Sequence, residues 1–168
     1  VIVNVQRGGP GLGDIQPAQG DYFQAVKGGG HGDYQLIVLA PSSVQEFADL
    51  AADAFDLADK YRNPVMILAD GMLGQMMEPV EFKPAKTQEE LDALANQHLS
   101  WCICPNADGD AKHHHEINSL ELDPEILEKK VSKLYEKYAE VEKNEVRYET
   151  YNLSDDNEIL CVAWGTAA

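Results

Sequence analysis

The chain has 168 residues, and 44% of them are hydrophobic, which is enough for one domain of ordinary size with a sizeable core. Its 13 lysines and arginines against 29 aspartates and glutamates give a formal net charge of −16. This charge disfavours binding to nucleic acid and to anionic membrane surfaces, because both attract proteins through lysine and arginine. No apolar segment approaches the roughly 18 residues that span a bilayer.

The first half of the chain predicts buried parallel strands separated by helices. Unbroken apolar runs without alternation are typical of strands covered on both faces, and they occupy residues 1–5, 36–40 and 65–69. A helix is expected over 17–26, with Pro17 suited to a first helical position. A longer one is expected from Ser43 to about Arg62, with Ser43 and Glu46 at the spacing of a capping box. Its predicted apolar face is Val44, Phe47, Ala48, Ala51, Ala54, Phe55, Ala58 and Tyr61.

The second half is less regular. We expect a short helix over 87–97, where Thr87 and Glu90 repeat the capping spacing, and an irregular excursion over 98–120. A long helix opens at 123–125, with an apolar seam made by Leu127, Val131, Leu134, Tyr138 and Val141. Extended segments are expected at 147–151 and 159–164. Alternating strands and helices with short connections predict an α/β fold with an open, mostly parallel sheet and flanking helices.

Three cysteines, Cys102, Cys104 and Cys161, are too few and too oddly numbered for a disulfide framework, so reduced thiols in a cytoplasmic protein are expected. Cys102 and Cys104 with His113, His114 and His115 do not have a standard zinc spacing, and we predict no metal site there. The role of the three histidines stays open. Residues 106–110 lack the glutamate of a calcium loop and are expected to form a turn.

A glycine-rich stretch, residues 7–13, follows the first strand. Four glycines in seven positions leave the backbone bare and able to approach a ligand closely. The one cation, Arg7, has a planar fork that suits a carboxylate or a phosphate. In an open α/β sheet, ligands bind at the carboxyl ends of the strands. This stretch therefore predicts an anion-binding loop, and the alternative is a connecting turn with a surface arginine.

Several stretches resemble the 2-oxoacid:ferredoxin oxidoreductases, specifically the subunit that carries the pyrimidine-binding domain of this thiamine-diphosphate family. They are residues 4–13, Gln19-x-Asp21-Tyr22, and residues 40–46, 64–71, 137–148 and 162–167. The resemblance covers nearly the whole chain. It implies three parts: the C-terminal part of the pyrimidine-binding domain over 1–84, a linker over 85–157, and over 158–168 the first strand of a transketolase-C-terminal-like domain. The chain has no initiator methionine, and we expect it to be an excerpt of that subunit.

The resemblance also implies a reaction, namely oxidative decarboxylation of a 2-oxoacid to an acyl-coenzyme A, with electrons passing through [4Fe-4S] clusters to ferredoxin. The diphosphate and its magnesium are expected on a partner subunit, as are the clusters. The glutamate that activates the cofactor is expected upstream of Val1. Alone, this excerpt is expected to be inactive.

By the same resemblance, the substrate-binding residues are Arg7, Gly9, Pro10, Leu12 and Gln16, with Arg7 holding the substrate carboxylate. Relatives that act on 2-oxoglutarate have Ser-Thr in place of Gly11-Leu12 and a threonine in place of Gln16. Without those hydroxyls the pocket is more apolar, and a second carboxylate left unpaired there costs several kcal/mol. We therefore predict a branched-chain substrate of the 2-oxoisovalerate (3-methyl-2-oxobutanoate) type. The alternatives are a 2-oxoglutarate enzyme and a non-catalytic anion-binding or interaction module.

Overall fold

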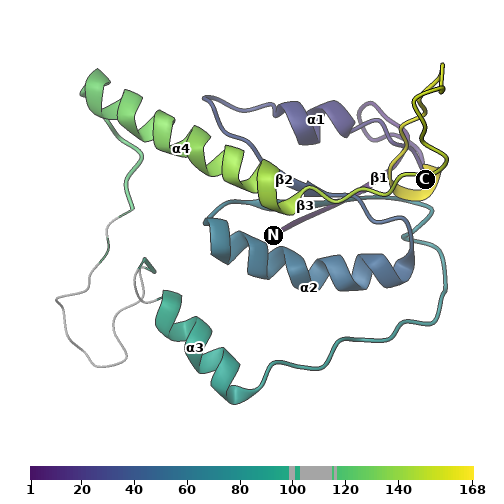
Figure 1. Cartoon of the computed structure of the whole chain (residues 1–168), viewed down its shortest axis with the longest axis horizontal. Coiled ribbons are helices and arrows are strands. Elements are labelled where there is room, and N and C mark those ends of the chain that lie inside the picture. Colours follow the sequence, from purple (N-terminus) through teal and green to yellow (C-terminus); the bar gives the residue numbers. More distant parts are fainter. Residues whose placement is uncertain (99–100, 103–114, 116) are drawn as a thin grey trace. The chain divides into compact units, whose positions relative to one another are not determined.

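The computed structural model describes residues 1–98, 101–102, 115 and 117–168. These form two compact units, one of residues 1–82 with 131–168 and the other of residues 83–130. The elements, in chain order, are β1 (Ile2–Gln6), α1 (Tyr22–Lys27), β2 (Ile37–Leu39), α2 (Val44–Tyr61), β3 (Val65–Asp70), α3 (Gln88–His98), α4 (Pro124–Glu145) and a 3-10 turn, η2 (Gly165–Ala167) (Figure 1).

The sheet of the first unit has the strand order β1-β3-β2, and both neighbouring pairs are parallel. β3 is therefore central, and four of its six residues are buried in an unbroken run that ends at Asp70. At the carboxyl edge Gln6 lies opposite Asp70, so β1 and β3 end side by side. The predicted α/β fold with parallel strands is confirmed.

Helix α2 connects β2 to β3 and supplies the main core contact. Ser43 caps it as predicted, since its hydroxyl accepts a hydrogen bond from the Glu46 N–H at 3.1 Å. The Glu46 carboxylate reaches back to the Ser42 N–H at 2.7 Å, one residue earlier than a capping box requires. The helix buries Leu50, Ala54, Leu57 and Tyr61 against β2 and β3.

The predicted apolar face of α2 is partly wrong, because Phe55 is 63% exposed. The buried residues follow the spacing 4-3-4 from Leu50, and Phe55 falls on the opposite side of this stripe. The helical spacing used for the prediction placed Phe55 on the apolar face and left out Leu50 and Leu57, which are buried.

The part of α4 from residue 131 belongs to the first unit. Tyr138 is buried, and its hydroxyl accepts a hydrogen bond from the Gln35 N–H at 2.9 Å. At the end of the helix, Glu145 accepts hydrogen bonds from Lys60 at 2.7 Å and from the Tyr61 hydroxyl at 2.6 Å. The predicted seam is therefore used where Tyr138 and Val141 meet the core, while Leu127 is 47% exposed.

Three predicted elements differ from the structure. Helix α1 begins at Tyr22 rather than near Pro17, because Pro17 pairs with Arg7 in an antiparallel bridge. Residues 147–151 and 159–164 are not strands. Both segments lack a neighbouring strand among the described residues, and without one the N–H and C=O groups of an extended chain have no ladder to join.

In the second unit, α3 has the predicted capping box. The Thr87 hydroxyl accepts a hydrogen bond from the Glu90 N–H at 3.3 Å, and the Glu90 carboxylate accepts one from the Thr87 N–H at 2.7 Å. The bond from the Thr87 N–H, and after it a bond from the Thr87 hydroxyl to the same carboxylate at 3.0 Å, lower the pKa of Glu90. Cys104, His113, His114 and residues 106–110 lie outside the described residues. Within the described part of the chain, no helix is long and apolar enough to cross a membrane.

Candidate functional site

The glycine-rich loop leaves the sheet at the carboxyl end of β1, where the sequence places it. The Gly71 N–H, directly after β3, donates a hydrogen bond to the Gln6 carbonyl at 2.9 Å. The loop and the turn after β3 therefore start from one point of the sheet edge. In parallel α/β sheets this edge is where ligands bind.

The loop closes on itself at its base. Gly8 N–H donates to the Gln16 carbonyl at 3.0 Å, and Asp14 N–H donates to the Gly8 carbonyl at 3.0 Å. The Asp14 carboxylate accepts a further bond from the Gln16 N–H at 3.0 Å. These three bonds hold residues 8–16 as one compact excursion that returns to the sheet at Pro17.

One of the four glycines is required by this geometry, and a second lies close against a side chain. A Cβ on Gly13, whose φ is +65°, would lie 1.8 Å from the Gly8 carbonyl oxygen. A Cβ on Gly8 would lie 2.5 Å from the Asp14 Oδ1. By contrast, a Cβ on Gly9 or Gly11 would meet nothing within 4 Å, so the tip of the loop presents bare backbone to open space.

All five predicted substrate-binding residues lie on this loop and are exposed: Arg7, Gly9, Pro10, Leu12 and Gln16. Leu12 is 84% exposed, and Ile15 beside it is 79% exposed. The Arg7 guanidinium forms no ion pair with any described residue of the chain. The loop thus offers a cation and two apolar side chains next to open backbone.

Sequence reasoning assigned no role to two polar residues of β1, Asn4 and Gln6, which support the loop from the sheet. Gln6 is 1% exposed; its amide donates to the Ala69 carbonyl at 3.3 Å, and its side-chain oxygen accepts the Asp21 N–H at 2.9 Å. Asn4 donates to the Asp21 carboxylate at 3.0 Å. The polar residues Asn4 and Gln6 interrupt an otherwise apolar strand, and this interruption is the signal that could have revealed them.

Asp70 is a second residue that the sequence reasoning missed. It is 3% exposed and ends β3 beside Gln6. One carboxylate oxygen accepts the N–H groups of Met72 and Leu73 at 2.9 and 3.2 Å. The other oxygen accepts the hydroxyl of Thr166. A buried charge needs such partners, and Asp70 thereby ties the turn after β3 to the C-terminal turn η2.

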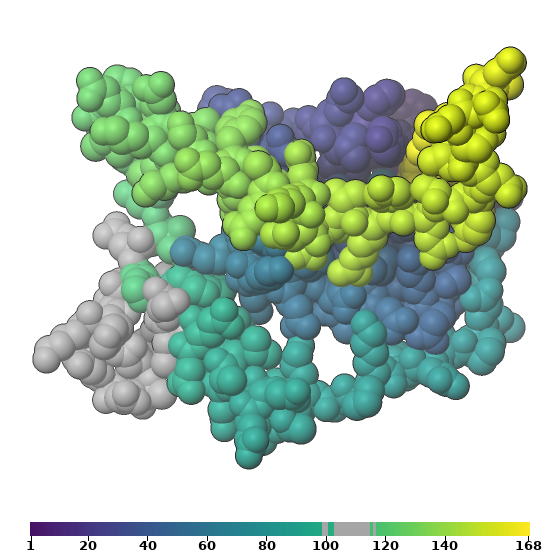
Figure 2. All heavy atoms as spheres, viewed as in Figure 1, coloured from purple at the N-terminus to yellow at the C-terminus, as the bar shows by residue number. Residues whose placement is uncertain are grey.

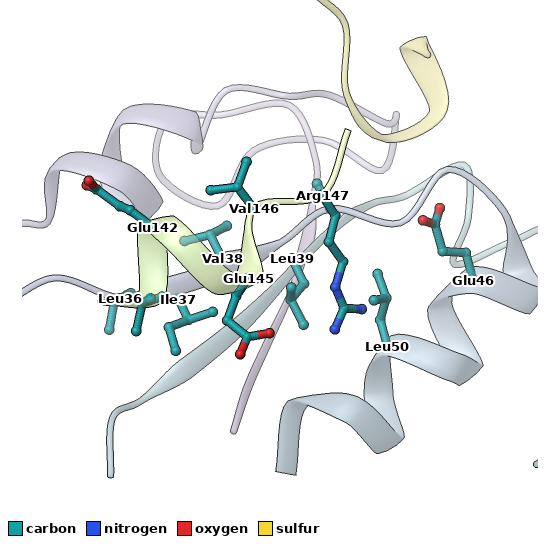
Figure 3. A pocket seen from close by; sticks show the side chains of 12 residues that line it. Leu36, Ile37, Val38, Leu39, Glu46, Leu50, Glu142, Glu145, Val146 and Arg147 are labelled. Carbon is teal, nitrogen blue, oxygen red and sulfur yellow. The ribbon is translucent and has the colours of Figure 1, made fainter. Parts of the chain in front are cut away.

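A cavity of about 320 Å³ lies along β2, between this strand, α2 and the end of α4, and its lining includes none of the predicted substrate-binding residues. Figure 3 shows Arg147 reaching into it from the segment after α4 toward α2, where it pairs with Asp53 at 3.0 Å. Hydrogen bonds from Lys60 and then Tyr61 lower the pKa of Glu145. These charged groups have partners within the chain, so they hold α4 on α2.

Metal ligands do not gather in the described part of the chain, where no group of three or more His, Cys, Asp or Glu side chains could hold an ion. Cys102 and Cys161 are free thiols. His115 is described, whereas Cys104 and the two preceding histidines are not.

The comparisons with known proteins identify the family of this chain. Residues 1–149 match the model of the family described as pyruvate flavodoxin/ferredoxin oxidoreductase, thiamine diphosphate-binding. The chain belongs to this family. The resemblance inferred from the sequence is therefore confirmed.

Relatives in this family carry two kinds of name. The chain is 52% identical over 168 residues to the ketoisovalerate oxidoreductase subunit VorB of Methanothermobacter thermautotrophicus, covering all of this chain and 45% of the relative. It is 35% identical over 181 residues to the 2-oxoglutarate synthase subunit KorA of Methanocaldococcus jannaschii, covering 99% of this chain and 49% of the relative. The chain thus spans about half the length of the curated relatives it matches.

The fold is also that of a solved oxidoreductase. The structure of 2-oxoglutarate:ferredoxin oxidoreductase from Magnetococcus marinus with 2-oxoglutarate, coenzyme A and succinyl-CoA bound superposes with a TM-score of 0.63. The match covers 90% of this chain and 30% of that one, at 23% identity. At this identity the likeness establishes the fold and does not identify the substrate.

Proposed function

We propose that this chain is part of a subunit of a ferredoxin-dependent 2-oxoacid oxidoreductase that converts a branched-chain 2-oxoacid of the 2-oxoisovalerate type to an acyl-coenzyme A. The observation that carries the proposal is the 52% identity to a ketoisovalerate oxidoreductase subunit over all 168 residues, the glycine loop included. The geometry supports it, because a cation, an apolar side chain and bare backbone lie together at the carboxyl edge of the sheet.

Each loop residue then has a role. The Arg7 guanidinium binds the substrate carboxylate through two parallel N–H bonds. Gly9 and Pro10 let the substrate lie close to the backbone. Gly9 has no side chain, and no atom of the chain lies within 4 Å of the position that a Cβ would take, so the substrate can occupy this space. Leu12 and Gln16 contact the substrate side chain. The 84% exposed Leu12 gains from burial against an isopropyl group.

The cofactors and partners follow from the proposal. When bound, thiamine diphosphate supplies stabilisation of the carbanion left by decarboxylation. This loop fits the substrate end of such a site, because it offers one arginine beside open backbone. We propose that a partner subunit holds the diphosphate and Mg²⁺, that further partners hold the [4Fe-4S] clusters that reduce ferredoxin, and that coenzyme A accepts the acyl group.

The domain division belongs to the same proposal. Residues 1–84 form the C-terminal part of the pyrimidine-binding domain, 85–157 the linker, and 158–168 the start of a transketolase-C-terminal-like domain. The glutamate that activates the cofactor comes from the part of the polypeptide before Val1.

A 2-oxoglutarate enzyme is the second candidate, because subunits named for 2-oxoglutarate synthase are 34–35% identical over 99% of the chain. It requires a partner for a second carboxylate. Leu12 offers none, and burying an unpaired carboxylate against it costs several kcal/mol. The side chain of Leu12 therefore favours the branched-chain substrate.

The test compares kcat/KM for 2-oxoisovalerate and 2-oxoglutarate in the full-length polypeptide assembled with its partner subunits. We expect a preference for 2-oxoisovalerate of at least about 100-fold. Leu12→Thr should reduce this ratio about tenfold. Ile15→Thr is the matched control, since Ile15 is equally apolar and exposed on the same loop and has no assigned contact. A preference of the unchanged enzyme for 2-oxoglutarate would overturn the proposal.

A further inference from the structure

The C-terminal turn lies against the base of the glycine loop. The Gln19 amide, two residues after the loop returns at Pro17, donates a hydrogen bond to the Trp164 carbonyl at 3.0 Å. The Trp164 ring stacks on Tyr22, the first residue of α1, with ring centroids 5.8 Å apart and planes at 29°. Figure 2 shows the yellow C-terminal segment against the purple N-terminal part of the chain.

The same turn is joined to the end of β3. The Thr166 hydroxyl donates to Oδ2 of the buried Asp70. The Oδ1 of Asp70 accepts the N–H groups of Met72 and Leu73 in the following turn. A Cβ on Gly71, in that turn, would lie 3.4 Å from both the Gln6 carbonyl oxygen and the Pro17 Cα. Asp70 therefore links Thr166 to both ends of the loop through one turn.

Gly165 shows how tightly the turn is seated. It is buried and has a φ of +62°. A Cβ there would lie 3.0 Å from Gln19 Nε2, 3.7 Å from the Pro41 carbonyl oxygen and 4.0 Å from Asp70 Oδ2. Gln19 lies after the loop, between β1 and α1, whereas Pro41 follows β2 and Asp70 ends β3. The turn therefore lies close to the end of the loop and to the carboxyl ends of β2 and β3.

We propose that the turn Trp164–Thr166 is a clamp that positions the Arg7–Pro17 loop for substrate binding, with Asp70 and Gln19 as its positioning residues. The last residues of the loop and those directly after it, which we call the return leg, are held at two points. Gln19 binds the Trp164 carbonyl, and Pro17 lies against the turn after β3. Loss of either contact frees the return leg, and Arg7 and Leu12 then lose their fixed positions. Because these two residues contact the substrate in the ground state as well as in the transition state, their misplacement raises KM with little change in kcat.

This inference rests on the proposed function, so its test measures loop motion and kinetics separately. Thr166→Val removes the hydroxyl and keeps the shape of the side chain. In the assembled full-length enzyme we expect hydrogen exchange of the Gly8 and Asp14 N–H groups to accelerate by about tenfold, which corresponds to about 1.4 kcal/mol. We expect the KM for 2-oxoisovalerate to rise about 3- to 10-fold, with kcat changed by less than about twofold.

Two further variants and one control sharpen the test. Thr166→Ser keeps the hydroxyl and should restore both readouts. Gln19→Leu breaks the contact to Trp164 without leaving Asp70 unpaired, and it should reproduce both effects even where Thr166→Val impairs folding. Thr150→Val makes the same chemical change at an exposed threonine away from the clamp and should change neither readout.

The outcomes are distinguishable. Unchanged exchange at Gly8 and Asp14 in both Thr166→Val and Gln19→Leu overturns the clamp. Faster exchange with an unchanged KM, while Arg7→Lys raises the KM, overturns the positioning role. If neither Arg7→Lys nor the clamp variants alter the KM, the proposed function of the loop fails, and with it the substrate role of the clamp.

Discussion

Replacing Gly13 by alanine should open the base of the glycine loop. Gly13 has a φ of +65°, and a Cβ there would lie 1.8 Å from the Gly8 carbonyl oxygen, which accepts the Asp14 N–H at 3.0 Å. An L-residue in the left-handed region costs roughly 1–2 kcal/mol. Loss of the bond from Asp14, which the clash forces, costs about 1 kcal/mol. Together they destabilise the closed loop by about 2–3 kcal/mol.

The other loop glycines provide matched controls. Gly11 also has a positive φ, +73°, but a Cβ there meets nothing within 4 Å, so Gly11→Ala should cost only the backbone strain, roughly 1–2 kcal/mol. At Gly9 neither penalty applies, and Gly9→Ala should change the free energy by less than about 0.5 kcal/mol.

The assay is hydrogen exchange of the Gly8 and Asp14 N–H groups in the full-length polypeptide, which gives the free energy of local opening. We expect protection to fall in the order Gly9→Ala, Gly11→Ala, Gly13→Ala. If Gly13→Ala exchanges as slowly as Gly9→Ala, the loop does not have the closed geometry on which the site is built.

Two further predictions concern the contacts that hold α2 in place. Ser43→Ala removes the N-cap oxygen and should lower the free energy of local opening at the Glu46 amide by about 1 kcal/mol. Ser43→Asp should restore this free energy, and an equal loss in both variants would contradict the capping role. Glu145 has a lowered pKa because Lys60 and Tyr61 donate to its carboxylate, so its contribution is present above the unfolded pKa of about 4.3 and is lost as pH falls through the folded value. Urea unfolding of wild type and Glu145→Gln should therefore give free energies that differ by about 1 kcal/mol or less at pH 7. This difference should shrink as the pH falls below about 4.3, and a difference that grows in acid would contradict the reasoning.

The amino-acid sequence alone identified the parallel strands, the capped helix α2 and the glycine loop at a strand end. Local chemistry is sufficient for these features: an unbroken apolar run is covered on both faces, Ser43 accepts the N–H of Glu46, and four glycines end a strand abruptly. The family was also within reach of the sequence, because the loop and the segments after it are similar to those of known relatives and the family match confirms this.

Errors arose where an element depends on a distant partner. The segment 159–164 has the composition of a strand, but it has no neighbouring strand among the described residues and its apolar side chains Ile159, Leu160 and Val162 are 71–83% exposed. Phe55 was assigned to the apolar face of α2 by its helical spacing, while in the structure the face that packs on β2 and β3 leaves it exposed. Strand pairing and helix rotation are decided by what packs against the element, and periodicity does not contain that information.

The sequence by itself thus determined the local elements and the composition of the loop, including Arg7 and Leu12. Only the tertiary structure decided that Gly13 is obligatory, that Gln6 and Asp70 support the loop, and that Thr166 contacts Asp70, 96 positions earlier in the chain. The physical reason is that a buried polar side chain must find a partner wherever the chain brings one. Its partner is set by the register of β1 on β3 and by the path of the C-terminal segment, which are properties of the folded chain.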